Sequence, residues 1–156
     1  MTARYDERGN LVEAAYFGLD GQPALSKSLG IVRMTARYDE RGNPVEQAYF
    51  GLDGQPTLSK DAGVARWTAR YDERGNQVEG AYFGIDGQPA LSKDGVARWT
   101  AHYDERGNPV EQAYFGLDGQ PALSKDAGVA RMTTRYDERG NRVEQSYFGL
   151  DGQPVR

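Results

Sequence analysis

The chain has 156 residues, of which 38% are hydrophobic and 27% charged, and its formal net charge is −4. This acidic balance leaves no basic surface for a phosphate backbone, so nucleic acid is excluded as an expected partner. The absence of cysteine excludes disulfides and thiolate metal sites, and no apolar run reaches the roughly 18 residues of a membrane-spanning helix, so no membrane insertion is expected.

The sequence repeats itself five times, and every copy contains the string YDERGN without change. A fixed period of this length is typical of repeat proteins, in which each unit buries its faces against its neighbours. Such near-identity indicates either recent duplication or a consensus sequence made by design, and both origins stay open. We expect one repeat domain spanning residues 1–156, with copies at 1–33, 34–66, 67–98, 99–131 and 132–156.

Three strands are predicted in each copy. In the second copy they span about Val32–Asp39, Asn43–Gly51 and Gln55–Lys60, which are rich in aromatic and β-branched residues between turn signals. A helix over Val45–Phe50 is the alternative, but Gly and Pro bracket that segment too closely. The fold class predicted is all-β: a tandem array of five antiparallel hairpins or three-stranded meanders, forming either an elongated ribbon or stacked sheets.

The first two connections are predicted to be three-residue hairpin turns. In Asp6–Asn10 the Asp side chain caps a type I turn, and Gly follows in the left-handed region. Gly18–Gln22 fits the same pattern. The glycines expected to have this structural role are Gly9, Gly21, Gly42, Gly54, Gly75, Gly87, Gly107, Gly119, Gly140 and Gly152. Gly80 lies in mid-strand, where Ala is expected to be tolerated.

The third connection varies in length between copies. Lys60–Val64 contains Asp-Ala-Gly, whereas Lys93–Val96 contains only Asp-Gly. Both sequences suit short hairpin loops, so both lengths are predicted to close a Lys–Val pair.

These turns predict a register, and the register predicts two faces. Carried through the hairpins, it places Trp67, Ala69, Tyr71, Ala81, Phe83, Pro89 and Leu91 on one apolar face, with a Glu79–Lys93 charge pair. This face is the predicted core. At each repeat boundary the same register moves the apolar side to the opposite face, so a continuous ribbon and separate stacked sheets stay open.

The other face carries the predicted binding residues, because Arg or His and Tyr recur on it in every copy. They are Arg4, Tyr16, Arg37, Tyr49, Arg70, Tyr82, His102, Tyr114, Arg135 and Tyr147. His102 stands where the other copies have Arg, which is typical of drift at a solvated position, and no catalytic residue is expected. The recurring acids lack the spacing of a calcium loop, so no metal and no cofactor are predicted.

The Y-D-x-x-G-N turn and the following strand that ends in Y-F-G resemble bacterial YD repeats of the RHS type. They also resemble MORN-type repeats, whose hairpins form elongated single-layer sheets. The resemblance covers Tyr5–Gly21 and its equivalents, about half of each copy. It implies an all-β, non-catalytic scaffold or binding array.

The function predicted from sequence is a non-enzymatic scaffold, or a multivalent module that binds a protein partner or associates with itself. Five near-equal units without one singular polar cluster favour this class over an enzyme. The alternatives are an array that binds glycan or cell wall through exposed aromatic residues, and a designed repeat protein without a natural ligand.

Overall fold

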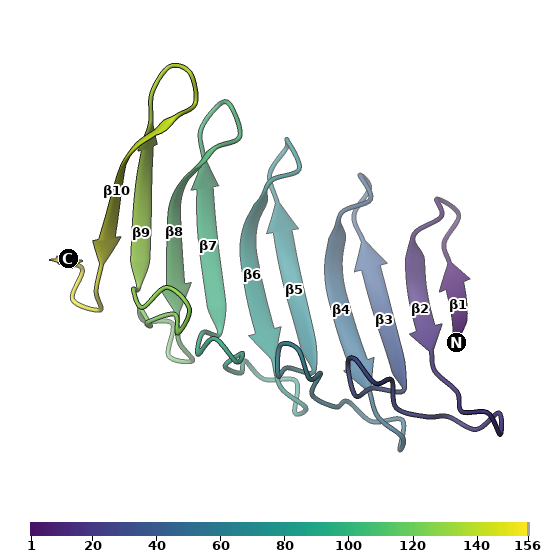
Figure 1. Ribbon diagram of the computed structural model, residues 1–156. Helices are drawn as coiled ribbons and strands as arrows, with labels where there is room; N and C mark the ends of the chain where they lie inside the picture. Colours follow the sequence, from purple (N-terminus) through teal and green to yellow (C-terminus); the bar gives the residue numbers. More distant parts are fainter. Residues whose placement is uncertain (156) are drawn as a thin grey trace.

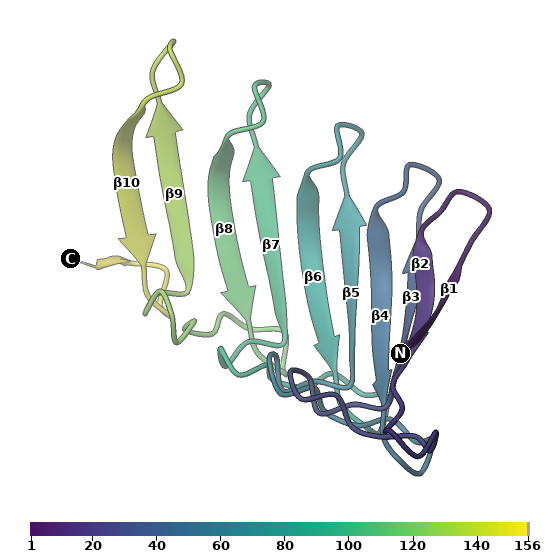
Figure 2. The same ribbon diagram turned by 45° about the vertical axis from the view of Figure 1, so that its right-hand side comes forward.

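In a computed structural model of the chain, which describes residues 1–155, all regular structure is β-strand in one antiparallel sheet. The strands pair in chain order, so every connection joins neighbours and the sheet is an open, twisted ribbon (Figures 1 and 2). The described strands are β1 (Thr2–Tyr5), β2 (Leu11–Ala15), β3 (Arg33–Tyr38), β4 (Pro44–Phe50), β5 (Arg66–Tyr71), β6 (Gln77–Phe83), β7 (Arg98–Tyr103), β8 (Pro109–Phe115), β9 (Arg131–Tyr136), β10 (Arg142–Phe148) and β11 (Pro154–Val155).

The hairpin tips form as the sequence predicts. In the third copy the Asp72 amide donates to the Asn76 carbonyl at 2.9 Å, and the Gly75 amide donates to the Asp72 carbonyl at 3.1 Å. The Asp72 carboxylate accepts from the amides of Arg74 and Asn76. Gly75 has φ +84°, a conformation that disfavours other residues, and the same left-handed φ recurs at all ten glycines assigned to these turns.

Acid should weaken these tips. The hydrogen bond from the Asn76 amide lowers the pKa of Asp72 below its ordinary 3.8, and the equivalent Asp is shifted likewise in every copy. A carboxyl whose folded pKa is depressed stabilises the fold above its unfolded pKa, and this contribution is lost as pH falls through the folded value. We expect thermal melts to show a melting temperature that drops below about pH 4, and to drop less in Asp72→Asn. A melting temperature independent of pH between 5 and 2 would contradict this role.

A β-bulge follows each tip and corrects the predicted register. Tyr71 pairs with Gln77, but the next pair is Arg70 with Glu79, so Val78 is an extra residue on its strand. The same shift occurs in the other four hairpins. Because one added residue reverses the faces of a strand, Trp67 and Ala69 lie opposite Tyr82 and Gly80, not opposite Ala81 and Glu79 as predicted.

The predicted third strand is instead an irregular connector. After the Gly51–Gln55 turn the chain makes only an isolated bridge between Phe50 and Pro56, then turns again between Ser59 and Val64. In the shorter third copy the equivalent turn closes between Ser92 and Val96, so the deletion is absorbed there. In connectors of both lengths the turn is closed by a Ser–Val pair, so it begins one residue before the Lys that was predicted to close it.

Repeat boundaries do not interrupt the sheet. β4 pairs directly with β5, with Gln47 opposite Trp67, so the ribbon is continuous and the sheets are not separate. The connectors also bond to each other, because the Lys60 amide donates to the Leu29 carbonyl at 2.9 Å, and the Lys93 amide donates to the Ala62 carbonyl at 2.9 Å. At the tips, Arg41 donates to the Glu73 carbonyl and the Tyr71 hydroxyl donates to the Pro44 carbonyl.

The core lies at the connector end of the ribbon. Its buried side chains include residues that follow the connector glycine just before β3, β5, β7 and β9, and two connector serines: Ile31, Val64, Ala65, Val96, Ala97, Val129, Ala130, Ser59 and Ser124. Ala69, predicted in the core, is buried, but Trp67 on the same predicted face is only half-buried and Leu91 is exposed. Toward the tips, no second layer of residues 1–155 covers either face of the sheet (Figures 1 and 2).

Candidate interaction surfaces

The bulge places the predicted binding residues on two opposite faces. Arg70 pairs with Glu79, whereas Trp67, three residues earlier, pairs with Tyr82. Side chains alternate along a strand, so Arg70 and Tyr82 point to opposite sides of the ribbon. We call the two surfaces the Arg–Glu face and the Tyr–Trp face. The predicted Arg and His positions (Arg4, Arg37, Arg70, His102 and Arg135) lie on the first, and the tyrosines (Tyr49, Tyr82, Tyr114 and Tyr147) lie on the second.

The Arg–Glu face carries a regular ladder of charges. Glu79 is held between Arg70 of its own hairpin at 3.2 Å and Arg98, the first residue of the next hairpin, at 3.3 Å. The guanidinium of Arg66 also lies 4.0 Å from the ring centre of Phe83. Equivalent pairs recur at Glu13, Glu46 and Glu111, with His102 replacing one Arg. The ladder therefore links each hairpin to the next and leaves the outer row of cations, such as Arg70, 71% exposed.

Replacing Glu79 by Gln should weaken this link. Exposed ion pairs contribute about 0.2–1 kcal/mol each, so we expect a loss of about 1 kcal/mol in the free energy of unfolding in urea, decreasing at high salt. Glu144→Gln is the matched control, because Glu144 pairs only with Arg135 among residues 1–155. Equal losses for the two variants would show that Arg98 of the next hairpin contributes nothing.

On the Tyr–Trp face one tyrosine is structural. Tyr49 is only 4% exposed, and its hydroxyl accepts a hydrogen bond from Trp67 Nε1 at 3.1 Å and donates to Gln47 Oε1 at 3.1 Å. Burial raises the pKa of Tyr49. Tyr82 and Tyr114 are half-buried, and Tyr147 is 37% exposed. Tyr16 belongs to no strand, and its amide donates to the Val32 carbonyl. A ligand on this face would reach the half-buried aromatic rings rather than Tyr49.

A third surface was missed by the sequence prediction, which placed Leu91 and its equivalents in the core. This surface consists of four units, each made of the leucine of one connector and the leucine or isoleucine in the G-L-D-G or G-I-D-G turn of the next copy. All eight residues are 45–63% exposed. We call this set the leucine stripe: Leu25, Leu52, Leu58, Ile85, Leu91, Leu117, Leu123 and Leu150. The repeated G-[LI]-D-G and L-S-K sequences could have indicated this surface, because an apolar residue within a polar turn is usually solvent-exposed.

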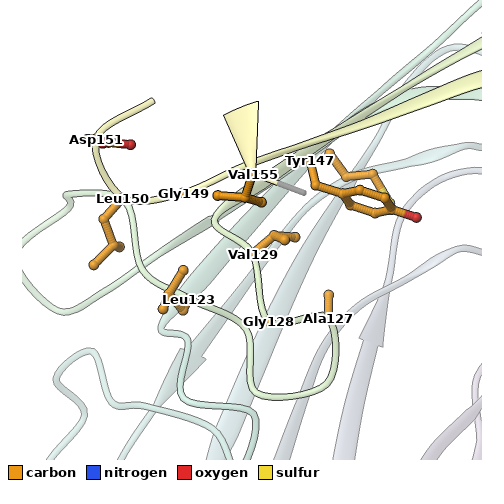
Figure 3. Close-up of a pocket in the computed structure, with 10 residues that line it drawn as sticks. Leu123, Ala127, Gly128, Val129, Tyr147, Gly149, Leu150, Asp151 and Val155 are labelled. Atoms are coloured by element: carbon orange, nitrogen blue, oxygen red, sulfur yellow. The ribbon is translucent and has the colours of Figure 1, made fainter. Parts of the chain in front are cut away.

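A connector leucine and a turn leucine of the stripe meet at one groove. Leu123 of the fourth connector and Leu150 of the fifth turn line a pocket of about 900 Å³, together with Val129, Tyr147 and Val155 (Figure 3). The copies share sequence and register, so the other pairs of the stripe are expected to neighbour each other in the same way.

No grouping of acidic or histidine side chains within residues 1–155 is suited to hold a metal ion. The described chain also contains no helix long and apolar enough to cross a membrane.

No protein-family model matches this chain, and no curated protein matches it. The class of the protein is therefore defined by its fold, an all-β ribbon built from repeated hairpins.

Proposed function

We propose that this protein is a non-enzymatic scaffold that binds protein partners multivalently. The observation that carries the proposal is the constant spacing of equivalent surfaces. Each copy adds one hairpin to the same sheet, so its Arg, Glu and Phe side chains recur every two strands, about 10 Å apart. Such an array offers several similar weak sites in a fixed geometry.

The coupling between copies supports this proposal. The charge ladder, the tip-to-tip contacts and the connector hydrogen bonds all join side chains or backbone of consecutive hairpins and their connectors. These contacts hold the sites at fixed separations, and fixed separations are what convert weak single contacts into strong overall binding. The resemblance to YD and MORN repeats, which implies a scaffold or binding array, agrees with the same function.

The exposed cations of the Arg–Glu face are the proposed contact residues. Arg37, Arg70 and Arg135 are 71% exposed, and each is anchored by a glutamate on one side only. Such an arginine keeps donors free for a carboxylate of a partner, since a guanidinium carries five N–H groups.

The test is the dependence of binding on repeat number. Immobilised chains of three, four and five copies would be compared for the proteins that they retain, and a retained protein would be purified and titrated. Affinity is expected to rise more steeply than the number of copies, and to be lost in Arg37→Glu/Arg70→Glu/Arg135→Glu with the circular dichroism spectrum unchanged. Affinity that is equal for all lengths would contradict multivalency, and no retention at all would favour a repeat protein without a natural ligand.

Glycan binding is the second candidate, because Trp67, Tyr82 and Trp99 lie half-buried on one face. Aromatic rings of this kind suit sugar rings and quaternary ammonium groups. A glycan array and a cell-wall pull-down would test it, with Trp99→Ala expected to abolish a signal that Arg70→Glu leaves unchanged. If both variants bind as the parent does, the aromatic face is not a glycan site.

A further inference from the structure

The leucine stripe is a set of eight exposed apolar side chains that the charge ladder and the aromatic network do not use. Its members remain about half exposed in the interior of the array, at Leu58 and Ile85, as well as near its end, at Leu123 and Leu150. Isolated surface leucines need no explanation, but Leu123 and Leu150 line one groove, and apolar surface gathered into a patch of several hundred Å² is typical of an interaction site.

The stripe is also held rigidly. Its connector leucines lie two residues before Lys60, Lys93 and Lys125, whose amides donate at 2.9 Å to carbonyls of the preceding connector. Its turn residues lie within the hydrogen-bonded turns that Gly54, Gly87 and Gly119 close. The stripe therefore needs little ordering upon binding, and ordering is one of the main costs of association.

We infer that the leucine stripe is the contact between two copies of this chain, which associate through a two-fold axis with stripe against stripe. The inference rests on the proposed function and deepens it, since it names a second copy as a protein partner. In a two-fold contact the same patch serves both molecules, and every unit of the stripe can meet a unit of the partner's stripe.

The spacing of the stripe favours a second copy over an amphipathic helix. Units of the stripe recur every two strands, at about 9.5 Å, whereas the leucines of a heptad helix recur about every 10.5 Å. The mismatch of about 1 Å per unit accumulates along the four units, so a straight helix loses register with the outer ones. The stripe of a second copy has an identical spacing and stays in register along its whole length.

Composition and charge agree with such a contact. Each partner of a stable interface buries roughly 800 Å², of which a little over half is apolar, and eight half-exposed side chains account for a large part of that apolar share. An Asp follows each turn residue directly, as Asp53 follows Leu52, and a Lys lies two residues after each connector leucine, as Lys60 does after Leu58. The rim therefore carries both signs of charge.

Light scattering after size-exclusion chromatography tests the inference on the full chain. At tens of micromolar we expect twice the chain mass of 17.3 kDa, decreasing to one chain mass on dilution. Leu58→Ser/Ile85→Ser/Leu91→Ser should be monomeric at the same concentration with an unchanged circular dichroism spectrum. Tyr5→Ser/Val143→Ser, which removes exposed apolar residues outside the stripe, should remain dimeric. A parent chain that is monomeric at every concentration, or a triple variant that still dimerises, overturns the inference.

An introduced cysteine locates the contact. The chain has no cysteine, and Ile85 is an exposed member of the stripe near the middle of the sequence. Near a two-fold axis, Ile85→Cys should form disulfide-linked dimers under mild oxidation, while Glu73→Cys at a hairpin tip should not. Equal cross-linking at both sites, or none at Ile85→Cys, overturns the assignment.

These outcomes separate this inference from the proposed function. If the chain is monomeric and its stripe binds a helical peptide with a leucine heptad repeat, the inference that a second copy occupies the stripe is overturned. A monomeric chain that still binds proteins in proportion to its repeats overturns the inference and leaves the proposed function standing.

Discussion

Replacing Tyr49 by Ala should lower the free energy of unfolding by about 3–5 kcal/mol, the range for deleting a buried aromatic ring. Tyr49 is 4% exposed, and its hydroxyl links Trp67 of the next copy to Gln47. Removing the ring leaves a cavity and also leaves the indole N–H of Trp67 without its acceptor. Urea unfolding followed by circular dichroism measures the loss.

Tyr147→Ala is the matched control, because the same tyrosine of the repeat is 37% exposed at this position. We expect it to cost less than half as much. Comparable losses at Tyr49 and Tyr147 would show that the neighbouring copy does not supply the burial.

Gly80→Ala should also destabilise the protein, by about 1–3 kcal/mol, as overpacking does elsewhere. A Cβ at Gly80 would lie 2.4 Å from Trp99 Nε1 and 2.6 Å from Cε2, so the indole must move. The sequence alone predicts tolerance here, because a mid-strand Gly usually gains from Ala. That prediction does not hold, since the ring of the next strand occupies the space.

A second substitution provides the test of this cause. In the second copy Gln47 lies opposite Trp67, whose indole N–H is turned to the Tyr49 hydroxyl, so the loss at Gly80→Ala is the cost of turning the Trp99 indole out of the space over Gly80. Gly80→Ala/Trp99→Met should therefore recover most of the stability lost. Gly75→Ala should cost about 1 kcal/mol for a different reason, its φ of +84°, and Trp99→Met should not rescue it. If Trp99→Met leaves the Gly80→Ala loss unchanged in thermal and urea unfolding, contact with the indole is not its source.

The turns could be predicted because their chemistry is local. The Asp carboxylate at the first position and Gly at the fourth determine the tip without help from the rest of the chain, and Asp72 and Gly75 have those roles in the structure. The all-β class follows from repeating such hairpins, whereas the choice between a continuous ribbon and stacked sheets stayed open until the pairing of β4 with β5 was seen.

The bulge could not be read from turn chemistry. Val78 is inserted two residues after the turn closes, and it reverses the faces of the whole strand. A signal was present in the charges: the observed register sets Arg70 against Glu79 in one hairpin and His102 against Glu111 in another. The predicted register set Glu79 opposite Ala69 and paired its charge with Lys93, which instead donates to the Lys60 carbonyl.

The core was misplaced for a tertiary reason. Large residues such as Trp67 and Leu91 were assigned to it, whereas the most buried side chains are small, including Val64 and Ala65. Burial here depends on stacking one connector against the next, and that contact joins residues about 30 positions apart, such as Lys60 and Leu29. Strand periodicity within a single copy carries no information about it.

Small-angle scattering on a chain that lacks residues 34–66 tests the central claim, that equivalent copies add in line to one open sheet. The deletion joins Arg33 to Trp67, reproducing the natural Arg66–Trp67 boundary. At a dilution where light scattering gives one chain mass, the shortened protein should remain folded, with its longest dimension reduced by about one strand pair, or 10 Å. An unfolded protein, or a folded one whose longest dimension does not change, would contradict the linear array.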